Sequence, residues 1–401
     1  MGTASGGAPA ERIRWWQDAR FGMFIHWGIY SPVGRGEWLM YREHVPNDEY
    51  RRLADAFDPQ HYHPRDWVAL AQDAGMKYMV LTTRHCDGFC LFDSKVSDFT
   101  SVKTAAQRDL IAEYAEACHA MGMRMGFYYS LVDWRFPGGL FCHPYDRRID
   151  YGPMVEQAHA QIRELLTNYG KVDILWYDGR HPGDIWRGKE LEPMVRGLQP
   201  GIITNDGPDA PGDFVTHEQN AAPDDRPWEA CYTMNDCWGY VPSEKNYKTV
   251  MQILGTLGVC AGQGGNLLLN VGPDGEGRIP TAASDRLRLV GKWMRVNGKA
   301  IYGSTRTVLR PPSEVGCSTR VGDRLYLLIH AWPGKTLALA WVGNRVLRAH
   351  VLATGDEARI EQRGDRVWLH DLPQYEPDPD VSVIELEVEG EPRWPELRFH
   401  S

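Results

Sequence analysis

The chain has 401 residues and a formal net charge of −9, which is long enough for a catalytic domain of about 250 residues and a smaller second domain. The acidic balance gives no electrostatic attraction to nucleic acid or to an anionic membrane, so we expect neither as a partner. The eight cysteines do not repeat the paired spacing of a zinc site, so we predict no metal and no cofactor.

The N-terminal segment, residues 1–10, has neither the basic start nor the apolar core of a signal peptide. No apolar run is long enough to cross a membrane. We therefore expect a disordered N-terminus over residues 1–10 and a cytoplasmic protein.

In the first half of the chain, apolar runs alternate with amphipathic stretches. Strands are predicted over 21–30, 78–83, 125–131 and 172–178, and helices over 63–76, 109–123 and 152–169. This alternation is typical of a parallel sheet and fits half of an eightfold barrel. A doubly wound open sheet is the alternative, but no strand is followed by the glycine-rich phosphate loop that such sheets often carry.

The second half is less regular. We predict a strand over 201–206, a helix over 246–257, a strand over 266–271 and a helix over 281–302. Beyond residue 305, short alternating runs separated by Gly, Asp and Pro indicate an all-β module, with strands predicted over 324–329, 336–341, 346–352, 367–372 and 381–388. The predicted fold is therefore α/β, a TIM-like (β/α)8 barrel over 11–304 followed by a small β-sandwich over 305–401.

Asp178 closes a short, mostly apolar predicted strand, Val-Asp-Ile-Leu-Trp-Tyr-Asp. In a barrel, active sites are built at the C-terminal ends of the strands. Glycoside hydrolysis needs two carboxyl groups, and Glu218 and Glu229 are the best-placed partners for Asp178. The competing interpretation is that Asp178 caps the turn that follows.

Polar side chains also follow earlier strands. His26 and His85 come at strand ends, and Glu37 and Trp38 stand together in a glycine-flanked loop. An acid beside an indole suits the binding of a polyol, whereas a lone histidine in an apolar strand is more often a core residue. These residues alone leave the two interpretations open.

The motifs taken together are more specific. They are Phe24–Gly28, Gly36–Trp38, Leu81–Phe89, Tyr128–Ser130, Leu175–Gly179, Trp228–Glu229 and Gly264–Pro273. Their order and spacing closely resemble the family 29 glycoside hydrolases, the retaining α-L-fucosidases. The resemblance runs from about residue 12 to 303.

The resemblance implies hydrolysis of terminal α-L-fucosyl residues of oligosaccharides or glycoconjugates by double displacement. Asp178 matches the nucleophile, and Glu229 is favoured over Glu218 as the acid/base. The residues that match the fucose pocket are Phe24, His26, Glu37, Trp38, His85, Tyr128, Trp176 and Trp238. Linkage, aglycone and oligomeric state are left open, a homo-oligomer included.

Two positions depart from the family pattern. Cys86 stands where a second histidine is common, and Gly207 follows Asn205-Asp206 where an arginine is common. The cationic contact to the sugar is therefore either lost or supplied elsewhere, with Arg180 as the candidate. Both departures touch the sugar subsite, so a galactoside of fucose configuration is an alternative substrate. Two further alternatives are a non-catalytic fucose-binding barrel and a metal-dependent hydrolase with ligands among His26, His85, Asp87 and Asp178.

Overall fold

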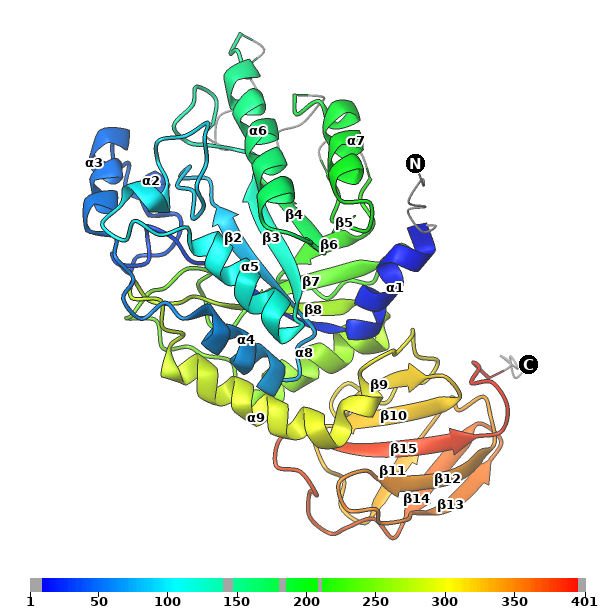
Figure 1. The fold of residues 1–401 in the computed structure, drawn as a ribbon. Coiled ribbons are helices and arrows are strands. Elements are labelled where there is room, and N and C mark those ends of the chain that lie inside the picture. The colour runs from blue at the N-terminus through cyan, green and yellow to red at the C-terminus, as the bar shows by residue number, and fades with distance from the viewer. Residues whose placement is uncertain (1–8, 140–145, 147, 180–184, 208–210, 396–401) are drawn as a thin grey trace.

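The computed structural model describes residues 9–139, 146, 148–179, 185–207 and 211–395 (Figure 1). Most of the N-terminal segment predicted to be disordered, and Arg180, lie outside these residues. Helix α1 spans Pro9–Ala19, so the prediction of disorder is wrong for residues 9 and 10. The helix is anchored there because Ile13 and Trp16 are buried against the barrel.

An eight-stranded sheet forms the barrel. Its strands, with bounds, are β1 (Phe21–Ile25), β2 (Tyr78–Arg84), β3 (Arg124–Ser130), β4 (Ile174–Asp178), β5 (Ile203–Thr204), β6 (Val215–Glu218), β7 (Trp228–Thr233) and β8 (Asn266–Val271). The order is β5-β4-β3-β2-β1-β8-β7-β6, and every neighbouring pair is parallel. A parallel bridge between Asn205 and Phe214 links the ends of β5 and β6. The predicted TIM-like barrel is confirmed.

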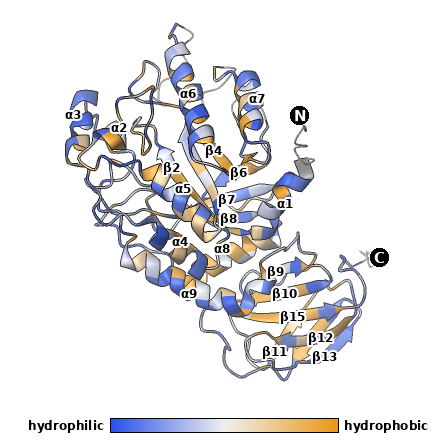
Figure 2. Cartoon of the chain, in the orientation of Figure 1, coloured by the Kyte–Doolittle hydropathy of each residue, from blue (hydrophilic) through white to orange (hydrophobic). Residues whose placement is uncertain are grey.

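Helices cover the outside of the sheet. They are α4 (Pro64–Asp73), α5 (Leu110–Met121), α6 (Gly152–Asn168), α7 (Gly188–Leu198), α8 (Val250–Gly262) and α9 (Thr281–Asn297), with the short α2 (Leu39–Arg42) and α3 (Asn47–Arg51) after β1. Hydrophobic and hydrophilic residues lie side by side on α6 and α9 (Figure 2), as expected for helices with one face on a sheet. Residues 219–227, between β6 and β7, form no helix, so this side of the barrel departs from an ideal (β/α)8 pattern.

Local capping sets the helix ends. Asp109 accepts a hydrogen bond from the amide of Ala112 and starts α5, while Gly122 ends it in the left-handed conformation. Thr249 and Gln252 form a capping box. That box starts α8 at Val250, four residues later than the sequence pattern predicts.

The barrel interior is a separate apolar layer, closed at one end by α1. Trp16 packs against Phe214 with ring centroids 4.4 Å apart, and its carbonyl accepts a hydrogen bond from Asn266, the first residue of β8. The end of the barrel where the strands begin is therefore plugged. The active site is therefore expected at the opposite end of the barrel, where the strands finish.

Two antiparallel sheets make up the C-terminal β-sandwich, as predicted. One contains β12 (Val346–Val351), β15 (Ser382–Val388), β10 (Arg324–Ile329) and β9 (Gly316–Val321), and the other β11 (Thr336–Leu339), β14 (Arg366–His370) and β13 (Arg359–Arg363). The sequence analysis missed β9 and β13, because both are rich in small or charged residues. No helix of the described chain is both long and apolar enough to span a bilayer.

The sandwich packs on the helices of its own barrel. The indole of Trp293 on α9 donates to the carbonyl of Val381, 2.6 Å away. A Cβ on Gly262, at the end of α8, would lie 2.0 Å from the carbonyl oxygen of Ser318 on β9. Glycine at this position therefore permits the close approach of helix and strand.

Candidate active site

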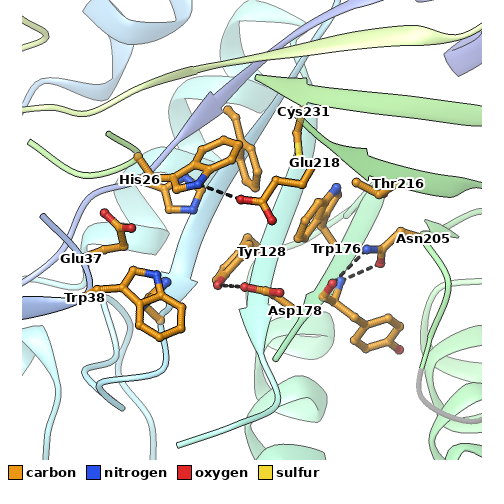
Figure 3. Close-up of a pocket in the computed structure, with 14 residues that line it drawn as sticks. His26, Glu37, Trp38, Tyr128, Trp176, Asp178, Asn205, Thr216, Glu218 and Cys231 are labelled. Carbon is orange, nitrogen blue, oxygen red and sulfur yellow. Dashed lines mark hydrogen bonds between the residues drawn. The ribbon is translucent and has the colours of Figure 1, made fainter. Parts of the chain in front are cut away.

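A cavity of about 380 Å³ opens at the C-terminal ends of the barrel strands. It is lined by Phe24, His26, Glu37, Trp38, His85, Tyr128, Trp176, Tyr177, Asp178, Asn205, Thr216, Glu218, Cys231 and Trp238 (Figure 3). All eight side chains predicted to contact the sugar are among them, together with Asp178 and Glu218. Glu229 is not.

Sequence reasoning missed four lining residues, Tyr177, Asn205, Thr216 and Cys231. Asn205 directly follows the short strand β5, so its place at the end of a strand was a usable signal. Its amide clamps Tyr177 by accepting from the Tyr177 N–H (2.7 Å) and donating to its carbonyl (2.9 Å). Tyr177 lies within the Leu175–Gly179 motif, whereas Thr216 and Cys231 belong to no motif that separates them from core residues.

Asp178 is fixed at the end of β4. Its carbonyl accepts from the amide of Leu131 at 2.8 Å, and its Oδ2 accepts from the hydroxyl of Tyr128 at 2.5 Å (Figure 3). The next residue, Gly179, has φ +67°, and a Cβ there would lie 2.7 Å from Oγ of Ser130. Only glycine fits this turn, which directs the carboxylate into the cavity.

Two neutral imidazoles face the cavity. His26 Nδ1 lies 2.7 Å from Oδ1 of Asn270, whose amide nitrogen donates to the carbonyl of Trp238. This assigns the ring proton of His26 to Nδ1 and leaves Nε2 as an acceptor. The pKa values of His26 and His85 are lowered to about 3, chiefly by burial, and at His85 the Arg84 charge contributes to this lowering.

Glu37 and Trp38 form the opposite wall. Oε2 of Glu37 accepts from the amide of Gly239 at 2.8 Å, and burial raises the pKa of Glu37. Trp38 packs on Trp134 with ring centroids 5.2 Å apart. The predicted pair of an acid and an indole is therefore presented to the cavity.

Glu218 is the last residue of β6 and is solvent-exposed. Its Oε1 accepts from the indole N–H of Trp238 at 3.1 Å (Figure 3). Glu218 thus stands at the mouth of the cavity, on the same side of the barrel as Asp178. That is where a departing group would be found.

Glu229 lies elsewhere. It is the second residue of β7, in register with Asn266 at the start of β8, and its exposed fraction is 1%. Its two oxygens accept from the Tyr78 hydroxyl and the Trp176 indole. The preference for Glu229 as acid/base is not supported, because the residue lies near the plugged end of the barrel, behind Trp176.

The two departures from the family pattern have structural consequences. Cys86 is buried with Sγ 3.0 Å from Oγ of Ser130 and does not line the cavity. Beside Gly207, Asp206 pairs with Arg226 at 2.7 Å. The suggested replacement, Arg180, lies outside the described residues.

The histidines and carboxylates of the cavity do not converge as a metal site. Asp87, a candidate ligand, instead accepts hydrogen bonds from the Tyr50 hydroxyl and the amide of Phe89. Among the residues that the structure describes, no three His, Cys, Asp or Glu side chains are grouped to hold an ion.

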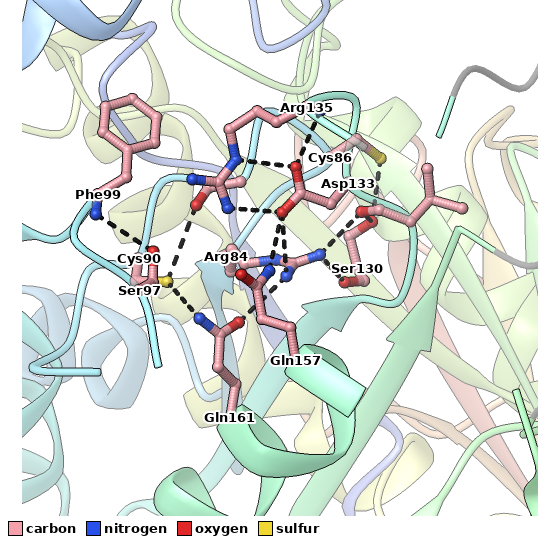
Figure 4. A network of polar contacts seen from close by, with 12 residues as sticks. Arg84, Cys86, Cys90, Ser97, Phe99, Ser130, Asp133, Arg135, Gln157 and Gln161 are labelled. Atoms are coloured by element: carbon pink, nitrogen blue, oxygen red, sulfur yellow. Dashed lines mark hydrogen bonds and ion pairs between the residues drawn. The ribbon is translucent and has the colours of Figure 1, made fainter. Parts of the chain in front are cut away.

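A buried ion network supports the wall that carries His85 (Figure 4). Asp133 pairs with Arg135 at 2.6 Å and with Arg84 at 3.5 Å, and all three are largely buried. Arg84 also donates to the carbonyls of Ser130 and Val132. The network joins the end of β2 to the loop after β3.

The α-L-fucosidase family profile matches residues 7–299. The chain belongs to the α-L-fucosidase family. Rat tissue α-L-fucosidase is 31% identical over 73% of this chain and 70% of its own length. Human tissue α-L-fucosidase is 30% identical over 90% of this chain and 85% of its own.

Solved structures agree with this assignment. Isoenzyme 1 from Paenibacillus thiaminolyticus is 38% identical, with a TM-score of 0.86 over 95% of this chain and 99% of its own. A family 29 α-L-fucosidase from Bacteroides thetaiotaomicron, trapped as a covalent intermediate, is 26% identical with a TM-score of 0.86 over 97% and 98% of the two chains. The protein is accordingly a glycoside hydrolase of the α-L-fucosidase class.

Proposed function

We propose that this enzyme removes terminal α-L-fucosyl residues from oligosaccharides or glycoconjugates with retention, using Asp178 as nucleophile and Glu218 as acid/base. The observation that carries the proposal is that these two carboxylates face one cavity, with Asp178 at its floor and Glu218 at its mouth (Figure 3). The covalent intermediate trapped in the Bacteroides relative supports the retaining route.

In the first step, Oδ1 of Asp178 attacks the anomeric carbon while Tyr128 holds Oδ2. The bond between the anomeric carbon and the leaving oxygen breaks. The leaving oxygen keeps the electron pair of that bond and receives a proton from Glu218. In the second step, Glu218 takes a proton from water, the water attacks the anomeric carbon, and the ester bond to Asp178 breaks. Both carboxyl groups return to their starting states.

The remaining wall residues suit a 6-deoxy sugar. Phe24 is packed against Trp238 with ring centroids 5.9 Å apart, which gives an apolar surface for a methyl group in place of a hydroxyl. Neutral His26 and His85, with Glu37, offer hydrogen-bonding groups for the ring hydroxyls.

The test is release of p-nitrophenol from four aryl glycosides: α-L-fucoside, α-L-galactoside, β-D-fucoside and β-D-galactoside. We expect turnover of the α-L-fucoside above all others. A preference for α-L-galactoside would show that the changes at Cys86 and Gly207 have altered the sugar subsite. Turnover of neither α-L-glycoside would contradict the proposal.

A further inference from the structure

Glu229 is a buried carboxylate that the proposed mechanism does not use. It is buried, and its carboxylate contacts Tyr78 and Trp176, which belong to the same apolar cluster as Trp16 of α1. A buried carboxylate costs several kcal/mol unless its oxygens are paired. The proposed mechanism gives Glu229 no role that accounts for this cost.

Both carboxylate oxygens of Glu229 accept hydrogen bonds. Oε1 accepts the indole N–H of Trp176 at 3.1 Å, and Oε2 accepts the hydroxyl of Tyr78 at 2.5 Å. Tyr78 is itself within 3.4 Å of Nδ2 of Asn266. Since each partner is a donor, the ionised carboxylate accepts from both, whereas a protonated carboxyl is a weaker acceptor and carries a proton for which neither of these donors is the partner.

Trp176 connects this buried acid to the reacting groups. Its indole lines the cavity and stacks on Tyr128, with ring centroids 5.5 Å apart and planes at 21°. Tyr128 in turn donates to Asp178. The orientation of the cavity floor is therefore linked, through a single indole N–H, to Glu229.

We propose that Glu229 is a positioning residue whose carboxylate, through its hydrogen bond to the Trp176 indole, fixes that indole beneath the bound sugar. The proposal rests on the proposed function only in taking the sugar to be fucose. The proposal adds to that function a role for Glu229, which takes no part in the chemical steps.

The ionisable groups around Glu229 leave it as the one that titrates near neutrality. Burial raises its pKa to about 7, against the opposing effect of its hydrogen bonds. Burial also raises the pKa values of Tyr78, Cys231 and Cys260, which stay neutral. Arg20, which contacts Asn266, stays charged because its pKa is lowered only to about 10.

The first experiment measures the dissociation constant of L-fucose by calorimetry between about pH 5.5 and pH 8.5. The wild-type enzyme should bind more weakly as pH falls through about 7, by about two- to ten-fold, because a neutral carboxyl is the poorer acceptor for Trp176. Glu229→Gln should lack this step. Tyr78→Phe, which removes a donor from the carboxylate, should move the step to higher pH.

The second experiment separates positioning from acid catalysis. With aryl fucosides of graded leaving-group pKa, Glu229→Gln should raise KM by a similar factor throughout, while the matched variant Glu218→Gln should lose kcat most on the poorest leaving groups. In a Trp176→Phe background, Glu229→Gln should have little further effect.

Three results would overturn the proposal: an unchanged pH step in Glu229→Gln, a loss that grows with leaving-group pKa, or additive effects with Trp176→Phe. Circular dichroism of each variant checks that it is folded. If wild-type enzyme neither binds L-fucose nor cleaves a fucoside, the proposed function fails instead, and the same series is run with the glycoside that is cleaved.

Discussion

The barrel lumen holds carboxylates at two depths, and these carboxylates differ in hydrogen bonding and in burial. At the open end, Asp178 and Glu218 each accept one side-chain hydrogen bond and face the cavity. Near the plugged end, Glu229 has both oxygens occupied and is almost fully buried. The difference teaches that catalytic use requires an oxygen that the protein has not already paired, at the end of a strand rather than at its start.

The largest effect that this comparison predicts is at Asp178. Asp178→Gly removes the attacking oxygen and should lower kcat by at least about 10³-fold. Azide fits the vacated space and should restore turnover of an activated aryl fucoside, giving a glycosyl azide of inverted configuration, which is identified by NMR. An Asp178→Gly variant with substantial activity would assign the nucleophile to another residue.

The second-largest effect is expected at Glu218, the residue at the mouth of the cavity. Glu218→Ala should lower kcat by about 10²–10⁴-fold on poor leaving groups and far less on activated aryl fucosides, which need no protonation. Steady-state rates on both kinds of substrate measure this. The same pattern from Glu229→Ala, with Glu218→Ala near wild type, would exchange the two roles and erase the contrast between the two depths.

The buried network behind His85 should matter for stability. Asp133→Asn leaves Arg84 and Arg135 without their shared carboxylate, and should lower the free energy of unfolding by about 3–5 kcal/mol. Glu357→Gln breaks the exposed pair with Arg348 and serves as the control, with a much smaller loss because solvent screens an exposed ion pair. Urea denaturation compares them; equal losses would show that burial of the network contributes nothing.

The smallest effect is the pH dependence of stability. The pKa of Glu229 rises from 4.5 to about 7 on folding, so the folded state binds more protons between these values and the free energy of unfolding falls as pH rises through them. The full difference is at most about 3 kcal/mol. Glu229→Gln should therefore gain stability relative to wild type at pH 8 compared with pH 5, and parallel curves would contradict this.

The sequence predicted the parts of the site that depend on strand ends. His26, His85 and Asp178 follow or close apolar runs, and parallel strands bring such positions to one edge. Glu218 and Glu229 could not be ranked in this way, because β6 has only four residues and no helix separates it from β7. Only the register places Glu218 at the end of its strand and Glu229 near the beginning of its own.

For the fold, too, the sequence predicted the elements that have local signals and missed those that depend on pairing between strands. Long amphipathic helices such as α5 and α6 were predicted within a few residues, because their periodicity and capping residues are local signals. Strands β9 and β13 were missed, because pairing with neighbouring strands, and not their own polar sequences, makes them extended.

The pairing of β1 with β8 has a consequence for synthesis of the chain. About 240 residues separate the two strands, and at roughly 5–20 residues per second a ribosome needs about 12–50 seconds to make them. Throughout that time one edge of Phe21–Ile25 has no native partner. Nascent chains that stall before Asn266 present an apolar, unpaired strand to other chains, so expression yield depends on how quickly the last barrel strand emerges.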